Sequence, residues 1–287
     1  MDASIIIPTY NRPDALRRCL QGVAALAFDR QRFEVIVVDD GSPIPAEKLA
    51  ANAASIPVRW LHQSNAGPAA ARNAGAAVAN GRFLCFTDDD CVPHPDWLGC
   101  LLTQFEQTPT AVLGGQTINQ LTDNPYAAAS QLLIDYLYNH CRAPGEDTPR
   151  FFTSNNLAVS ADLFGQMGGF DTSMPLAAGE DREFCERWRL AQRPLQFVPD
   201  ALIYHAHPLT LRRFWRQHFN YGRGAWQFRQ RHGRAKWEGG GFYGRLLTYP
   251  WRVEKMGVRK RPLLTCLLII SQLANAAGYV REQRFRE

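Results

Sequence analysis

Three consecutive carboxylates, Asp88, Asp89 and Asp90, follow an apolar stretch in the segment FLCFTDDDCVPHPDW. Like charges this close repel one another, so each needs water or a cation to balance it. Carboxylate and imidazole groups are suitable ligands for Mn²⁺ or Mg²⁺, and His205 and His207 end a strand-like stretch later in the chain. The pattern indicates a divalent-metal site. Because these ligands do not complete a coordination sphere, we expect phosphate oxygens of a nucleotide to supply the others.

Polar side chains also end two earlier apolar runs. Thr9 and Tyr10 end the run ASIIIPTY, and Asp39 and Asp40 end the run FEVIVVDD. The carboxylates of Asp39 and Asp40 can accept hydrogen bonds from a base or a ribose. Each cluster alone could serve as a helix cap or a turn. Because helix caps do not require three adjacent acids, the clusters together predict a functional site.

The elements that must position these side chains alternate between strand-like and helix-like stretches. Strands are predicted at residues 3–10, 33–42, 58–63, 82–90 and 111–119, and helices at 12–26, 46–54, 67–79 and 94–107. This alternation predicts an α/β fold with right-handed crossovers and a mainly parallel sheet flanked by helices. Ligands of such sheets bind beyond the carboxyl ends of the strands, where the polar clusters lie.

The second half of the chain is predicted to complete the site. Helices are expected at residues 124–140 and 179–192, and a strand at 195–207. The helix at 179–192 opens on Glu180 and Asp181, which a helix dipole favours at that end. A purely structural role at the helix start is the alternative to a catalytic one.

Seven stretches, in order, resemble those of family 2 glycosyltransferases with the GT-A fold, a Rossmann-like architecture. They cover roughly residues 3–208 and read SIIIPTYNR, VIVVDDGS, NAGPAAARNAG, FTDDDCVPHPDWL, GGFD, GEDREFCERW and ALIYHAH. Any one of these motifs alone is weak, because a DxD sequence often occurs by chance. Their order makes the resemblance specific for the reaction class. It implies sugar transfer from a nucleotide-sugar donor to an acceptor hydroxyl, usually with inversion at the anomeric carbon.

The resemblance also implies roles for individual residues on the donor side. The residues expected to bind the nucleotide sugar are Thr9, Tyr10, Asp40, Asn65, Arg72, Asp88 and Asp89. We expect Asp88 to serve the ribose or an ordered water, and Asp89 to shape the turn and contact the donor. Asn65 and Arg72 are expected near the phosphates or the base.

The remaining roles concern the metal and the acceptor. Asp90 and His205 are expected to bind Mn²⁺ or Mg²⁺, with His207 as an alternative to His205. By the resemblance, Asp181 is the catalytic base, and Glu180 binds the acceptor or supports the base. Asn155 and Asn156 in the segment TSNN are further candidates for contact with the acceptor. We expect Trp97 to pack in the core, with sugar stacking as the alternative.

Two other classes of protein compete with this interpretation. A nucleotidyltransferase would carry a glycine-rich basic loop after the first strand, but the segment there is PTYNRPD. A non-catalytic sugar-nucleotide-binding protein would be expected to lack the base or the metal ligand, and both Asp181 and Asp90 are present. The expected pathway is cell-surface glycan, polysaccharide or glycolipid synthesis, with a glycan or a lipid-linked acceptor.

Cysteine usage and charge bear on the compartment and the partners. The 7 cysteines are odd in number and scattered, which predicts a reducing compartment. The first apolar run is too short for a signal peptide and has no basic leader, so we expect the folded domain to begin with it. The spacing of Cys91, His94 and Cys100 fits no structural zinc pattern.

The charge is unevenly distributed along the chain. Residues 1–208 carry 15 Lys/Arg and 23 Asp/Glu, whereas residues 209–287 carry 17 Lys/Arg and 4 Asp/Glu. We therefore expect a catalytic domain at 1–208 and a basic, aromatic, helical region at 209–287 that faces an anionic partner.

The apolar segment at 263–280 raises the question of a membrane. It contains Ser271, Gln272, Asn275 and Gly278, whereas a spanning helix needs about 20 mostly apolar residues. We expect an amphipathic helix on an anionic membrane surface, with the protein cytoplasmic and peripheral on that membrane. Packing on protein and a true span are the alternatives. Nucleic-acid binding is not expected, because no nucleic-acid motif accompanies the basic residues.

Overall fold

A computed structural model describes residues 1–53, 55–140, 148–174, 178–233, 241–253 and 257–286. The chain forms two compact units. The first consists of Met1–Ile118, Arg150–Pro175 and Glu180–Ala206, and the second of Asn119–Pro149, Leu176–Gly179 and His207–Glu287. The domain boundary expected after residue 208 stays a prediction.

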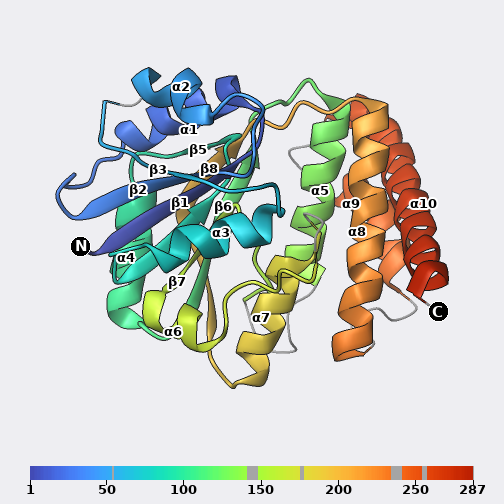
Figure 1. Cartoon of the computed structure of the whole chain (residues 1–287). Helices are drawn as coiled ribbons and strands as arrows, with labels where there is room; N and C mark the ends of the chain where they lie inside the picture. The colour runs from blue at the N-terminus through green and yellow to red at the C-terminus, as the bar shows by residue number, and fades with distance from the viewer. Residues whose placement is uncertain (54, 141–147, 175–177, 234–240, 254–256, 287) are drawn as a thin grey trace. The chain divides into compact units, whose positions relative to one another are not determined.

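The first unit contains an eight-stranded mixed sheet (Figure 1). The strands are β1 (Ala3–Thr9), β2 (Phe33–Asp39), β3 (Arg59–His62), β4 (Phe83–Thr87), β5 (Cys91–Pro93), β6 (Val112–Asn119), β7 (Asn156–Ser160) and β8 (Leu195–His205). Their order in the sheet is β3-β2-β1-β4-β7-β6-β8-β5. The pairings among β3, β2, β1 and β4 are parallel, and β7 pairs antiparallel with β4 and β6. The predicted α/β class is confirmed, and each of these antiparallel pairings, together with that of β5 and β8, includes a strand from the second half of the chain, β7 or β8.

Helices cover both faces of this sheet. They are α1 (Pro13–Ala24), α2 (Ala46–Ala50), α3 (Pro68–Ala77), α4 (Trp97–Gln107), α6 (Ala161–Gln166) and α7 (Glu180–Leu190), with the 3₁₀ turn η1 (Ala51–Ala53). Side chains alternate between the two faces of a strand. Val35 and Val37 of β2 therefore join the cluster that contains the buried residues of α1 and α4. Ile36 and Val38 pack with Ala71 of α3 on the opposite face.

The second unit is helical. Its helices are α5 (Pro125–His140), α8 (Leu211–His232), α9 (Phe242–Arg252) and α10 (Arg261–Arg286), with the 3₁₀ turn η2 (Val258–Lys260). A buried cluster that includes Leu132, Phe214, Leu246 and Leu268 joins these four helices. The helical C-terminal region that the sequence predicts is therefore present, and α5 from the middle of the chain packs with it.

Candidate active site

The carboxyl ends of β1, β2 and β4 bring the predicted polar residues to one edge of the sheet. Thr9 is the register partner of Asp39 on the neighbouring parallel strand. β4 pairs with the other side of β1 and ends at Thr87, so the three acids that follow begin at the same edge. Near-continuous burial of these strands, Thr9 and Thr87 included, makes them a rigid support for that edge.

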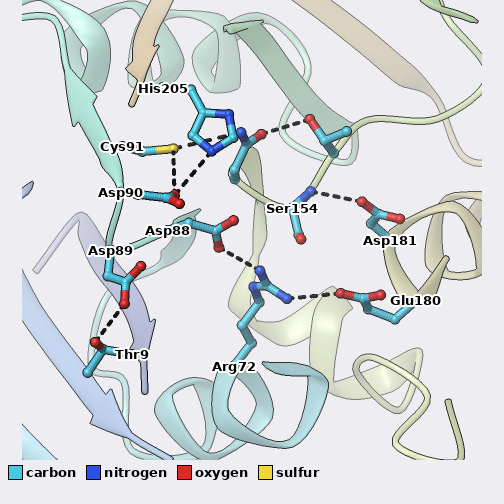
Figure 2. Close-up of polar contacts among 12 residues, drawn as sticks. Thr9, Arg72, Asp88, Asp89, Asp90, Cys91, Ser154, Glu180, Asp181 and His205 are labelled. Carbon is cyan, nitrogen blue, oxygen red and sulfur yellow. Dashed lines mark hydrogen bonds and ion pairs between the residues drawn. The ribbon is translucent and has the colours of Figure 1, made fainter. Parts of the chain in front are cut away.

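Each of the three acids has different partners (Figure 2). Asp88 accepts a hydrogen bond from Arg72 at 2.6 Å. Asp89 is buried and accepts one from the Thr9 hydroxyl at 2.7 Å. Asp90 is also buried, and its Oδ1 lies 3.2 Å from Nε2 of His205. The three adjacent carboxylates therefore have different surroundings, and the separate ligand roles expected for them stay predictions.

Arg12 is a member of this site that the sequence analysis did not single out. Its Nη1 donates to Asp89 at 3.1 Å and to Asp90 at 2.7 Å. Burial raises the pKa of Asp89 to about 7, although the charge of Arg12 opposes that shift. Asn11 precedes Arg12 in a left-handed conformation (φ 52°), which asparagine tolerates better than most residues. The signal in the sequence was a basic residue directly after the polar end of the first strand.

Asp90 and His205, which the sequence predicts to be metal ligands, lie next to each other in the structure. β5 and β8 pair antiparallel with Cys91 opposite His205, which brings the imidazole beside the preceding carboxylate. Burial alone would lower the pKa of His205, but its hydrogen bond to Asp90 and that residue's charge outweigh burial, so the pKa is raised. Both residues belong to a possible metal-binding Asp/His group. One carboxylate and one imidazole suit Mn²⁺, with further positions for water or phosphate oxygens.

Arg72 connects the triple acid to the start of α7. Its guanidinium is buried and donates to Asp88 and, at 3.1 Å, to Oε1 of Glu180. The Nε atom of Arg72 is buried and has no hydrogen-bond partner among the residues that the structure describes. A buried arginine that bridges two acids fixes their separation, so Arg72 ties the predicted donor side to the predicted acceptor side.

Glu180 and Asp181 are adjacent acids in the first turn of α7. Burial raises the pKa of Glu180 to about 7, the charge of Asp181 adds to the shift, and Arg72 opposes it. Burial also raises the pKa of Asp181, although its carboxylate accepts hydrogen bonds from the backbone N–H groups of Arg182 (2.7 Å) and Ser154 (3.2 Å). A carboxylate whose pKa lies closer to neutrality is better suited to accept a proton in a reaction.

This geometry can be compared with known proteins. The sequence matches the family described as Glycosyl transferase family 2 over residues 4–165, more than half of the chain. The chain belongs to glycosyl transferase family 2. It is 32% identical over 237 residues to the pre-mycofactocin glycosyltransferase of Mycobacterium tuberculosis, covering 80% of this chain and 48% of that protein. It is 27% identical over 205 residues to the glycosyltransferase AglE of Haloferax volcanii, covering 70% of this chain and 66% of that protein. The chain thus spans about half the length of the first of these relatives.

Solved glycosyltransferases share the fold of this family 2 member. The mannosyltransferase PcManGT from Pyrobaculum calidifontis, in complex with GDP-Man and Mn²⁺, has a TM-score of 0.69 at 16% identity and covers 99% of this chain and 88% of that one. TarS 1–349 from S. aureus, in complex with UDP-GlcNAc, has a TM-score of 0.56 at 17% identity. The match covers 100% of this chain and 92% of that one. At this level of identity the likeness shows the GT-A fold.

The residues predicted to bind the nucleoside lie at the ends of β1 and β2 and in the segment between β3 and α3. The carboxylate of Asp40 is buried and accepts hydrogen bonds from Gln63 Nε2 and from two backbone N–H groups at the start of α3. Asn65 donates to the backbone carbonyl of Asp40 at 2.9 Å. Gly41 has a φ of 84°, and a Cβ there would lie 2.8 Å from the backbone nitrogen of Asn65. These contacts hold the segment after β2 against the segment that leads into α3. Tyr10, at the end of β1, is 48% exposed. Their contacts with a nucleoside remain predictions.

The two acceptor candidates, Asn155 and Asn156, are both buried. Asn156 accepts a hydrogen bond from the indole of Trp97 at 2.8 Å and donates to the carbonyl of Ala201 at 2.9 Å. Asn155 accepts one from the hydroxyl of Thr153 at 2.8 Å. Each amide therefore has a structural partner within the first unit, and acceptor contact stays a prediction. Trp97 is fully buried, which confirms its expected place in the core.

Proposed function

We propose that this protein is a metal-dependent, inverting glycosyltransferase that moves a sugar from a nucleotide-sugar donor to an acceptor hydroxyl. The observation that supports this most strongly is the network around Arg72, which joins the acids after β4 to the acids at the start of α7. Family membership and the names of the relatives support the reaction class. The solved neighbours whose titles name GDP-Man and UDP-GlcNAc support a nucleotide-sugar donor.

The proposed residues divide the chemistry between a donor side and an acceptor side. Asp90 and His205 would hold Mn²⁺ or Mg²⁺, and the bound ion would stabilise the charge that develops on the departing diphosphate. Asp181 accepts the proton of the acceptor hydroxyl while the oxygen of that hydroxyl forms a bond to the anomeric carbon. The bond from that carbon to the diphosphate breaks, and the diphosphate leaves with the electron pair. A single displacement of this kind inverts the configuration at the anomeric carbon.

The proposal extends to the cellular role and the domains. We propose residues 1–208 as the catalytic domain and residues 209–287 as a basic helical region. A glycan or lipid-linked acceptor in polysaccharide or glycolipid synthesis fits this class of enzyme. The expected location is cytoplasmic and peripheral on the membrane.

A thermal-shift screen of nucleotide sugars, with and without Mn²⁺, tests the proposed function. A ligand that binds the native state raises the unfolding midpoint by mass action. We expect one donor to raise the midpoint of the wild-type chain only when Mn²⁺ is present, and Asp90→Ala to remove that shift. A screen in which every nucleotide sugar leaves the midpoint unchanged would contradict the proposal, as would a shift that does not depend on metal.

A further inference from the structure

One face of α10 exposes an almost continuous apolar stripe. Leu263 is 50% exposed, Ile269 42%, Leu273 58% and Val280 44%. Cys266, Ala276 and Ala277 are exposed on the same side of the helix. At about 1.5 Å per residue the stripe is about 26 Å long. Isolated exposed apolar residues need no explanation, but a contiguous stripe of this length marks an interaction surface.

The opposite face of α10 is packed tightly on α8, which lies beside it (Figure 1). A Cβ on Gly222 would lie 1.8 Å from the carbonyl oxygen of Asn275, and one on Gly278 would lie 1.9 Å from that of Phe219. The two helices therefore approach each other at points where only glycine fits. Glu282 of α10 is buried and accepts hydrogen bonds from Arg223 and Gln227 of α8, at 2.6 and 2.7 Å.

This packing argues against a membrane-spanning role for α10. By length and composition alone, the stretch Val258–Phe285 is long and apolar enough to cross a membrane. A crossing would either separate Glu282 from Arg223 or carry the arginine-rich α8 into hydrocarbon. Both outcomes are costly, because charged groups within a bilayer need partners or water. The inner face of α10 therefore stays packed on α8, and only the outer stripe is available for contact with a membrane or another molecule.

Positive charges stand at both ends of the stripe. Arg259 and Lys260 precede α10, and Arg281 and Arg284 lie in its last turns, all four exposed. The one acid in the described part of α10 is Glu282, which is buried against α8. The exposed surface of this helix thus combines an apolar centre with cationic ends. Anionic lipid headgroups complement such a surface.

We propose that the outer stripe of α10 lies in the interface of an anionic lipid bilayer, with the helix axis parallel to the membrane. A second copy of the chain fits this surface less well, because its stripe carries the same cationic ends. Pairing two α10 helices, parallel or antiparallel, would bring arginines of one copy against those of the other. The inference rests on the membrane location proposed above and names the surface that would carry it. It does not depend on the proposed glycosyl transfer, because its test contains no nucleotide sugar.

Flotation of the full chain with vesicles tests the proposal. We expect the wild-type chain to float with vesicles that contain phosphatidylglycerol and to float much less with pure phosphatidylcholine. The double variant Ile269→Gln/Leu273→Gln should bind the anionic vesicles about tenfold more weakly, because two exposed apolar side chains no longer enter the interface. The matched control Ile44→Gln/Leu190→Gln changes two exposed apolar residues of the first unit and should bind like the wild type.

A second pair of variants tests the charges. Arg259→Gln/Arg284→Gln should reduce binding to anionic vesicles several-fold at low salt, whereas the control Arg18→Gln/Arg32→Gln should not. Equal flotation of the wild-type chain with both kinds of vesicle overturns the proposal, whether or not a variant folds. A wild-type dimer in lipid-free solution that Ile269→Gln/Leu273→Gln converts to a monomer also overturns it, because a second copy would then cover the stripe.

Discussion

Nη1 of Arg12 lies 2.7 Å from Oδ2 of Asp90, the carboxylate that we propose as a metal ligand. The other oxygen of Asp90 faces His205 at 3.2 Å. Arg12 thus places a positive charge beside the carboxylate to which a divalent cation would bind. The guanidinium and the cation would compete for Asp90, and the side chain of Arg12, half-exposed, has room to move.

Arg12→Gln is expected to bind Mn²⁺ more tightly than the wild type in the absence of any nucleotide. Removing a half-exposed ion pair frees Asp90 at a gain of about 1 kcal/mol or less, so the change should not exceed about fivefold in affinity. Electron paramagnetic resonance of free Mn²⁺ during a titration measures it. Arg18→Gln, an exposed arginine of α1, is the control. Weaker Mn²⁺ binding by Arg12→Gln would mean that Arg12 supports the metal site.

Asp90→Ala is expected to weaken Mn²⁺ binding by about tenfold or more, because it removes a direct ligand. His205→Ala should have a similar effect if both side chains bind the ion. The same titration measures both variants, with Asp200→Ala as an exposed control on β8. If Asp90→Ala and His205→Ala bind Mn²⁺ like the control, the ion lies elsewhere.

The sequence predicted the parts of the site that follow strand ends. The three acids after β4, Thr9 at the end of β1 and His205 at the end of β8 come together because each position depends mainly on the strand that precedes or contains it. Arg12 was missed because a long side chain can point many ways from its turn. In the structure Arg12 follows the left-handed Asn11 and points to Asp89 and Asp90, a contact across a long stretch of sequence.

The roles of the asparagines and of Asp40 could not be predicted for a different reason. Amide and carboxylate groups can serve a ligand or the protein itself, and the sequence pattern is the same for both. The indole of Trp97 comes from a distant segment to meet Asn156, and the N–H groups at the start of α3 come to meet Asp40. Such pairings depend on tertiary structure.

Asn156→Ala is expected to destabilise the chain by about 2 kcal/mol, because the Trp97 indole and the Ala201 carbonyl would be left buried without their partner. Chemical denaturation measures the free energy of unfolding. Asn52→Ala, at an exposed position of η1, should change it by less than about 0.5 kcal/mol. A loss for Asn156→Ala no larger than that of Asn52→Ala would show that these hydrogen bonds contribute little.

Asp181→Asn is expected to abolish sugar transfer and to leave nucleotide binding largely intact. Loss of a general base costs about 10² to 10⁴ in rate, whereas the amide keeps the size of the side chain. Initial rates with the donor found in the thermal-shift screen, together with the donor's dissociation constant, separate the two effects. Asp162→Asn, an exposed acid of α6, should retain the wild-type rate. Wild-type turnover by Asp181→Asn would show that the base is another residue.

The raised pKa of Glu180 predicts how stability depends on pH. Burial, aided by Asp181, raises this pKa from 4.5 to about 7. Between these values the folded chain keeps a proton that the unfolded chain has released. The free energy of unfolding therefore falls as the pH rises through this range. The contribution of Glu180 to this fall is on the order of 2 kcal/mol.

Glu180→Gln should remove this contribution, because the amide does not titrate. The stability of the variant relative to the wild type should therefore increase from about pH 5 to about pH 8. At the higher pH the wild type must keep a charged carboxylate buried, which lowers its free energy of unfolding. Denaturation curves at both pH values measure the difference. Glu106→Gln, an exposed acid of α4, should show no such change with pH. If the stability difference between Glu180→Gln and the wild type stays constant across this range, the prediction is wrong. Arg72 would then keep Glu180 ionised at every pH tested, and the carboxylate would be a fixed charge beside Asp181.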